Sequence, residues 1–93
     1  MPAKLILAPE VELDITDAYD WYESRRPGLG EEFLGCVEAC LEAIRRTPET
    51  FFKVHEDYRR GLLRRFPYAI FYEENDNTVT IYGVMHTSRD LIK

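Results

Sequence analysis

The first half of the chain shows one extended run and two helical ones. Residues 4–8 form a short apolar run of strand type, which Pro9 ends because proline cannot donate to a central ladder but fits the first turn of a helix. From Glu10 to about Arg25, hydrophobic residues recur at spacings of three and four, which predicts an amphipathic helix. The predicted apolar face of this helix consists of Val11, Ile15, Ala18, Trp21 and Tyr22.

A second helix is predicted after the break at RPGLG, from about Glu31 to Arg46. Its acidic start and its two C-terminal arginines suit the helix macrodipole, and Pro48 follows its end. The predicted apolar face consists of Phe33, Val37, Cys40, Leu41 and Ile44. Because only about four or five residues link the two helices, we expect an antiparallel hairpin whose apolar faces point the same way.

Strand-like alternation dominates the second half of the chain. Three runs, residues 58–64, 68–74 and 79–85, predict strands, and ENDN predicts the turn between the last two. In the middle run, Ala69, Phe71 and Glu73 alternate with Tyr68, Ile70 and Tyr72; in the last run, Val79, Ile81 and Gly83 alternate with Thr80, Tyr82 and Val84. Neither face is wholly polar, so both are expected to be at least partly covered. The segment TPETFFKVHED has no clear period and is predicted to be a linker.

The predicted order of elements is β-α-α-β-β-β. This order indicates an α+β fold, in which an N-terminal strand and an antiparallel helical hairpin pack on a mainly antiparallel sheet. A chain of 93 residues with 45% hydrophobic content is enough for one domain, spanning residues 1–93, and too short for two. So small a core predicts modest stability, which a bound partner would raise.

The formal net charge of −5 is unevenly distributed. Residues 1–50 hold 5 Lys and Arg against 11 Asp and Glu, whereas residues 51–93 hold 7 against 6. Proteins that bind nucleic acid through charge alone are normally basic throughout, so non-specific nucleic-acid binding is disfavoured. The sequence is still compatible with a local basic patch, because four arginines lie close together: Arg59, Arg60, Arg64 and Arg65.

The two cysteines, Cys36 and Cys40, are four residues apart in a helical pattern. This spacing is typical of reduced, core-facing thiols, and neither a disulfide nor a metal site is expected from it. The chain shows neither a secretory signal pattern nor an apolar run of about 18 residues, so a soluble cytoplasmic protein is expected.

Candidate chemistry gathers around the predicted strands. Arg64 and Arg65 lead into RRFPYAIFY, and His86 and Arg89 follow the last predicted strand in VMHTSRD. Antiparallel pairing could bring the start of one strand beside the end of another, so Arg64 or Arg65 could lie near His86.

Three segments in this order, PEVELDITDAYDWYESRRPGLGEEFL, RRFPYAIFYE and VMHTSRD, resemble the RelE/ParE superfamily of type II toxin-antitoxin toxins over nearly the whole chain. The resemblance implies a small cytoplasmic bacterial toxin, without cofactor or metal, that a cognate antitoxin neutralises. One branch of the superfamily cleaves mRNA on the ribosome. The other, ParE-like branch poisons DNA gyrase and is not a nuclease.

A RelE-like ribonuclease would need proton transfer and cations beside the scissile phosphate. His86 could exchange the proton, Arg65 and Arg89 could hold phosphate oxygens, and Glu56 could serve as a base. Each also has a structural interpretation. His86 could cap the strand end or pack against Tyr82, the Arg64–Arg65 pair could be a solvated end with one salt bridge to the acidic helices, and Arg89 could orient the C-terminal segment through Asp90.

Three features favour the ParE-like branch. Tyr68 stands where RelE-like toxins place an arginine, the chain lacks the aromatic or basic tail of many relatives, and its acidic first half opposes docking on ribosomal RNA. In a ParE-like toxin, exposed arginines and aromatic groups would bind a protein target. The candidate target-binding residues are Arg59, Arg60, Arg64, Arg65 and Tyr68. A third hypothesis is a non-toxic relative that only binds the antitoxin.

Overall fold

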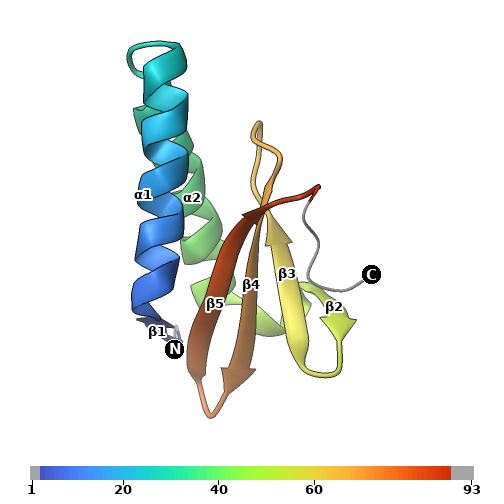
Figure 1. The fold of residues 1–93 in the computed structure, drawn as a ribbon. Helices are drawn as coiled ribbons and strands as arrows, with labels where there is room; N and C mark the ends of the chain where they lie inside the picture. Colours follow the sequence, from blue (N-terminus) through green and yellow to red (C-terminus); the bar gives the residue numbers. More distant parts are fainter. Residues whose placement is uncertain (1–2, 89–93) are drawn as a thin grey trace.

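The computed structural model describes residues 3–88, which form two layers (Figure 1). A hairpin of two helices lies across one face of a five-stranded sheet, and its turn extends past the end of the sheet. The elements are, in order, β1 (Lys4–Leu7), α1 (Pro9–Arg25), α2 (Leu29–Arg46), the short 3-10 helix η1 (Pro48–Thr50), β2 (Phe52–His55), β3 (Tyr58–Leu62), β4 (Tyr68–Asn75) and β5 (Thr78–His86).

The sheet has the order β1-β5-β4-β3-β2. Strand β1 pairs in parallel with β5, with Leu5 opposite Val79, and every other pair is antiparallel. Asp76 and Asn77 adopt positive φ angles, as the tight turn between β4 and β5 requires. The predicted α+β fold and its helical hairpin are therefore confirmed.

The prediction of a linker before β3 was wrong, because part of that segment is the edge strand β2. Phe52, Lys53 and His55 are all exposed, and only Val54 is partly buried. A short strand at a sheet edge buries too little to impose an apolar alternation on its sequence. Its periodicity is consequently absent from the sequence although its backbone pairs with β3.

A β-bulge at Tyr82 changes which face of the sheet the side chains after it in β5 lie on. Tyr72 lies opposite Ile81 and Phe71 opposite Gly83, so Tyr82 is an extra residue in the ladder. Simple alternation predicted that Val84 would face away from Val79 and Ile81, and this was wrong. Val84 belongs to the same buried cluster as those two residues, on the side covered by the helices.

The helices bury the faces predicted for them, with one exception. Val11, Phe33, Val37 and Ile44 are fully or almost fully buried. Trp21, however, is 52% exposed, whereas its neighbour Tyr22 is buried. Adjacent helical residues point about 100° apart, and here Tyr22 points into the core while Trp21 lies at its edge, so the assignment of Trp21 to the core was wrong.

The hairpin turn is held by a carboxylate that crosses from α1 to α2. Helix α2 has no side-chain cap of its own, and Glu23 of α1 accepts the backbone N–H groups of Gly28 at 3.0 Å and Gly30 at 2.9 Å. A negative charge at a helix N-terminus is also favoured by the macrodipole. Gly28 has a φ of +90°, and a Cβ on Gly30 would lie 2.9 Å from the Glu23 carboxylate and the Tyr19 ring. Both glycines of PGLG are therefore required by geometry.

A buried hydroxyl joins the sheet to the segment that follows α2. Tyr72 in β4 is fully buried, and its Oη donates to the carbonyl of Pro48 in η1 at 2.6 Å. Nearby, Cys40 is buried and Cys36 is partly buried, and both are free thiols, as predicted. Burial raises the pKa of the Cys40 thiol to about 11, so it stays protonated near neutral pH.

Replacing Tyr72 by Phe should lower the free energy of unfolding by about 1–2 kcal/mol, because the buried Pro48 carbonyl would lose its donor. Urea denaturation measures the change. Tyr82→Phe is the matched control, since its exposed hydroxyl donates to Glu73 at 3.0 Å and its loss should cost no more than about 0.5 kcal/mol. Equal losses in the two variants would contradict the role given to the Tyr72 hydroxyl.

Glu23→Ala should lower the free energy of unfolding by about 1–2 kcal/mol, because two N–H groups at the start of α2 would lose their acceptor. The same denaturation measurement applies. Glu38→Ala, at an exposed position in α2, removes an equal charge and should change stability by less than about 0.5 kcal/mol. A Glu23 variant as stable as the Glu38 variant would show that solvent replaces the cap without cost.

Candidate functional site

Four aromatic rings connect the helical hairpin to the start of β4. Tyr22 and Phe33 lie 5.3 Å apart across the hairpin, and Phe66 lies 4.9 Å from Tyr22 and 5.5 Å from Phe33. The ring of Tyr68 lies 5.2 Å from Phe33. The FPY motif therefore has a structural basis: Phe66 is buried in this cluster, Pro67 is exposed, and Tyr68 closes the cluster toward the sheet.

Arg65 forms an ion pair with the helical hairpin. Its guanidinium donates to Glu32 of α2 at 2.7 Å, and Arg26 lies 3.4 Å from the other oxygen of the same carboxylate. The hydrogen bond from Arg65 is the main cause that lowers the pKa of Glu32 below its usual range. Because Arg65 has a φ of +71°, the loop turns sharply after Arg64. The structural interpretation of this pair, a solvated end with one salt bridge to an acidic helix, fits Arg65.

Arg64 and Arg65 lie at an apolar groove beside α2, which we term the α2 groove. Its volume is about 530 Å³. Small residues of α2 form one wall, and Phe51 and Leu62 form the other, where Leu62 is 57% exposed. The residues that line the α2 groove are Gly35, Cys36, Ala39, Cys40, Ala43, Phe51, Leu62, Arg64 and Arg65.

The two arginines of β3 point to opposite faces of the sheet. Successive residues of a strand alternate in direction. On one face, the guanidinium of Arg59 donates to the carbonyl of Phe51 at 2.6 Å. On the other, Arg60 lies 5.3 Å from the centre of the Phe52 ring. The four predicted target-binding arginines thus do not form one patch.

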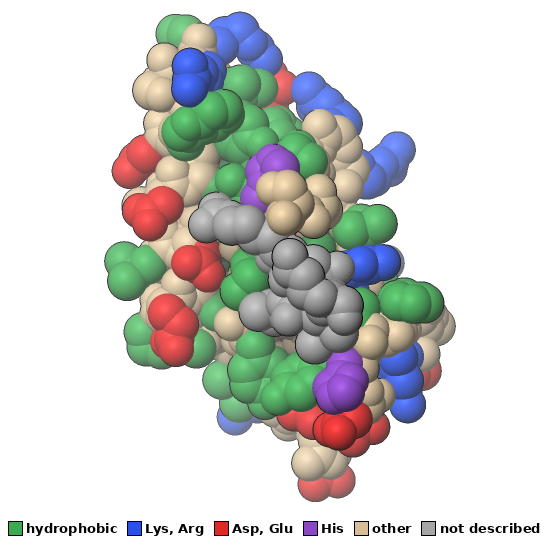
Figure 2. Space-filling model, turned by 45° about the vertical axis from the view of Figure 1, so that its right-hand side comes forward, with side chains coloured by type: hydrophobic (Ala, Val, Ile, Leu, Met, Phe, Trp, Pro, Cys, Tyr) green, Lys and Arg blue, Asp and Glu red, His purple; other side chains and the backbone are tan. Residues whose placement is uncertain are grey.

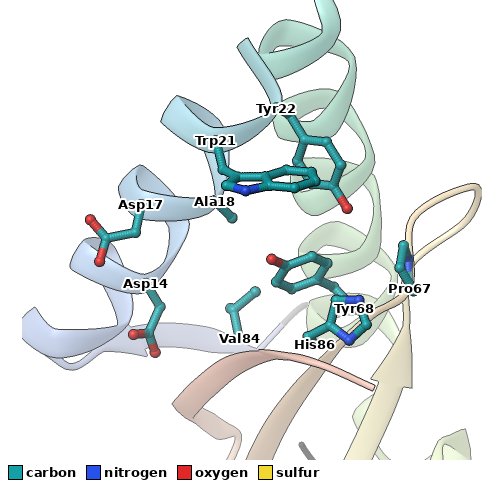
Figure 3. Close-up of a pocket in the computed structure, with 9 residues that line it drawn as sticks. All are labelled: Asp14, Asp17, Ala18, Trp21, Tyr22, Pro67, Tyr68, Val84 and His86. Carbon is teal, nitrogen blue, oxygen red and sulfur yellow. The ribbon is translucent and has the colours of Figure 1, made fainter. Parts of the chain in front are cut away.

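His86 lies at a second cavity, between α1 and the sheet, which we term the α1 hollow (Figure 3). Its volume is about 620 Å³, and its lining residues are Asp14, Asp17, Ala18, Trp21, Tyr22, Pro67, Tyr68, Val84 and His86. His86 is the direct cross-strand partner of Tyr68, with ring centres 5.3 Å apart, and its Nδ1 lies 2.8 Å from the Ser88 hydroxyl. The aromatic partner of His86 is therefore Tyr68 and not Tyr82.

The candidate ribonuclease residues are spread over the molecule. Arg65 lines the α2 groove, whereas His86 lines the α1 hollow. Glu56 lies in the turn before β3, and the register places that turn near Glu73 of β4, at the opposite end of β4 from His86. Arg89 lies outside the described residues. Within residues 3–88, no group of His, Cys, Asp or Glu side chains could hold a metal ion, and no helix is long and apolar enough to cross a membrane.

Sequence reasoning missed the acidic rim of the α1 hollow. Asp14 and Asp17 are three residues apart on α1, followed by the exposed ring of Trp21. The signal was present as acidic residues at helical spacing beside two adjacent aromatic residues, of which only Tyr22 is buried. Figure 2 shows acidic side chains along the left edge and at the bottom of this face, and most Lys and Arg side chains at the top and right.

The fold has a match among solved structures. A solved structure described as the chromosomal ParDE TA system from P. aeruginosa superposes with a TM-score of 0.67, covering 90% of this chain and 95% of that chain at 16% sequence identity. No curated protein matches the sequence. Residues 5–91 match the model of a family described as ParE toxin of type II toxin-antitoxin system, parDE. The chain therefore belongs to the ParE toxin family, and the predicted resemblance is confirmed.

Arg65→Gln should raise the pKa of Glu32 toward its ordinary value near 4.5, because the main hydrogen bond that stabilises the carboxylate would be lost. In the wild type, the stability from this lowered pKa is present above pH 4.5 and is lost as the pH falls through the folded-state pKa; in the variant, this acid-sensitive contribution shrinks. NMR titration of the side-chain carboxyl measures the shift. Arg64→Gln is the control, because Arg64 forms no ion pair within the described residues and should leave the pKa of Glu32 unchanged.

Proposed function

We propose that this protein is a growth-inhibiting toxin that acts on DNA gyrase and is neutralised by a cognate ParD-type antitoxin. The ParE family membership and the fold shared with a ParDE system support this proposal. In this proposal the toxin acts in the cytoplasm, where its target and the antitoxin are also located. The toxin acts by binding, and it catalyses no cleavage of RNA.

We prefer binding over RNA cleavage as the mechanism because the candidate catalytic groups are separated in the structure. Metal-independent RNA cleavage needs a proton-transfer group and cations within reach of one phosphate. Arg65 and His86 line different cavities, and Arg65 is already held by Glu32 at 2.7 Å. This arrangement favours recognition of a protein over bond chemistry.

The α2 groove and its arginines are the surface that we assign to the target. Protein-binding sites commonly combine an apolar centre with arginine at the edge. Leu62 supplies exposed apolar surface, and Arg64 supplies a guanidinium that no described carboxylate neutralises. Arg59 and Tyr68, in contrast, are engaged within the fold, through the Phe51 carbonyl and the aromatic cluster respectively.

Induced expression in a bacterial host should stop growth, and expression of the protein encoded by the neighbouring reading frame should restore it. The purified chain should inhibit supercoiling by purified DNA gyrase and trap gyrase-DNA adducts. Ribosome-dependent mRNA cuts with unaffected gyrase would replace the proposal by the RelE-like nuclease. Uninterrupted growth would favour the non-toxic antitoxin-binding module.

The double variant Arg64→Ala/Arg65→Ala should weaken inhibition of gyrase by about tenfold or more, since exposed arginines at interfaces are frequent hot spots. The concentration for half-inhibition of supercoiling measures the change. Arg45→Ala/Arg46→Ala is the matched control, because it removes the same charge at the far end of α2, where both arginines pair with Glu42. Equal weakening by both variants would mean that only net charge matters and would remove the α2 groove as the target surface.

A further inference from the structure

The α1 hollow combines aromatic walls with an acidic rim. Trp21 and Tyr22 of α1 face Tyr68 and His86 of the sheet across it, and Asp14 and Asp17 lie on its α1 side (Figure 3). Among the described residues that line it there is neither a lysine nor an arginine. The cavity therefore presents negative charge and aromatic surface to whatever enters it.

The acidic groups of the α1 hollow have no cationic partner within residues 3–88. Asp14 and Asp17 form no ion pair there, whereas Glu32 and Glu42 are each held by two arginines. Helix α1 as a whole carries six carboxylates against the single cation Arg25. Such a surface attracts positive charge and repels anions.

Trp21 already accepts a guanidinium on its ring in this structure. Arg25 lies with its Cζ 4.3 Å from the centre of the indole ring, which is close enough for a cation–π contact. Trp21 is also 52% exposed, so part of its ring is accessible to a ligand. Its exposure and its place beside two carboxylates suit the recognition of a planar cation.

We propose that the α1 hollow binds an arginine side chain of the antitoxin. The identity of the partner rests on the proposed function, whereas the chemistry of the cavity does not. A guanidinium can stack on aromatic faces and pair with carboxylates through parallel N–H bonds, which a lysine ammonium does less well. The α1 hollow is distinct from the α2 groove, so target recognition and antitoxin recognition use different sides of the helical hairpin.

A titration with a small probe tests the cavity alone. Trp21 is the only tryptophan of the chain, so the NMR signal of its indole N–H reports on the α1 hollow without interference. N-acetyl-L-arginine amide should shift this signal saturably, with a Kd on the order of 1–10 mM for a single side chain. N-acetyl-L-citrulline amide, which has a similar shape and no charge, should shift it much less. Equal shifts by both probes, or no saturable shift by the arginine probe, would overturn the proposal.

Two double variants distinguish the effect of the cavity carboxylates on probe binding from the effect of the overall charge of α1. Asp14→Asn/Asp17→Asn should weaken binding of the arginine probe by about tenfold. Glu10→Gln/Asp20→Asn removes the same charge from exposed positions of α1 outside the cavity and should change the Kd by less than about twofold. Equally weakened binding of the arginine probe in both double variants would also overturn the proposal. None of these measurements depends on gyrase, so a toxin that inhibits gyrase but ignores the arginine probe would refute this inference alone, and the reverse result would refute the proposed function alone.

Discussion

The contact of Tyr22, Phe33, Phe66 and Tyr68 is the interaction on which the remaining architecture depends. The helices and the sheet share one buried core, and these rings fill the part of it that joins the hairpin to the start of β4. Aromatic side chains bury a large area each and favour edge-to-face geometry, so the cluster fixes both the distance and the angle between the layers. The α1 hollow and the α2 groove are the spaces left on either side of this joint.

Charge is distributed around that joint in a way that suits two different partners. The outer surface of α1 is acidic, and the loop before β4 carries Arg64 and Arg65. Internal ion pairs such as Arg65–Glu32 hold part of the basic loop against the hairpin and leave other groups accessible. In the function proposed above, separate surfaces of opposite charge would guide the target and the antitoxin each to its own side.

The sequence predicts the helices, their buried faces and four of the five strands well, because each of these elements carries an apolar pattern that burial imposes. It misses β2, whose exposed residues carry no such period, and it misplaces Trp21, since a helical face cannot be drawn finely enough to separate adjacent rings. The candidate site was harder to predict from the sequence. That Arg59 and Arg60 alternate across β3 follows from strand geometry, but the turn at Arg65 and the pairing with Glu32 depend on a backbone conformation that composition does not encode.

The bulge at Tyr82 has an evolutionary consequence. Because one extra residue reverses the facing of the last third of β5, Val84 and His86 form the floor of a cavity under α1 instead of lying on the outer side of the sheet. Loss of the Tyr82 codon alone would remove the bulge but keep Val84 opposite Ile70 and His86 opposite Tyr68, so the floor of the cavity would stay on the same face of the sheet. The bulge therefore lets this strand lose one residue without changing which side chains line the cavity.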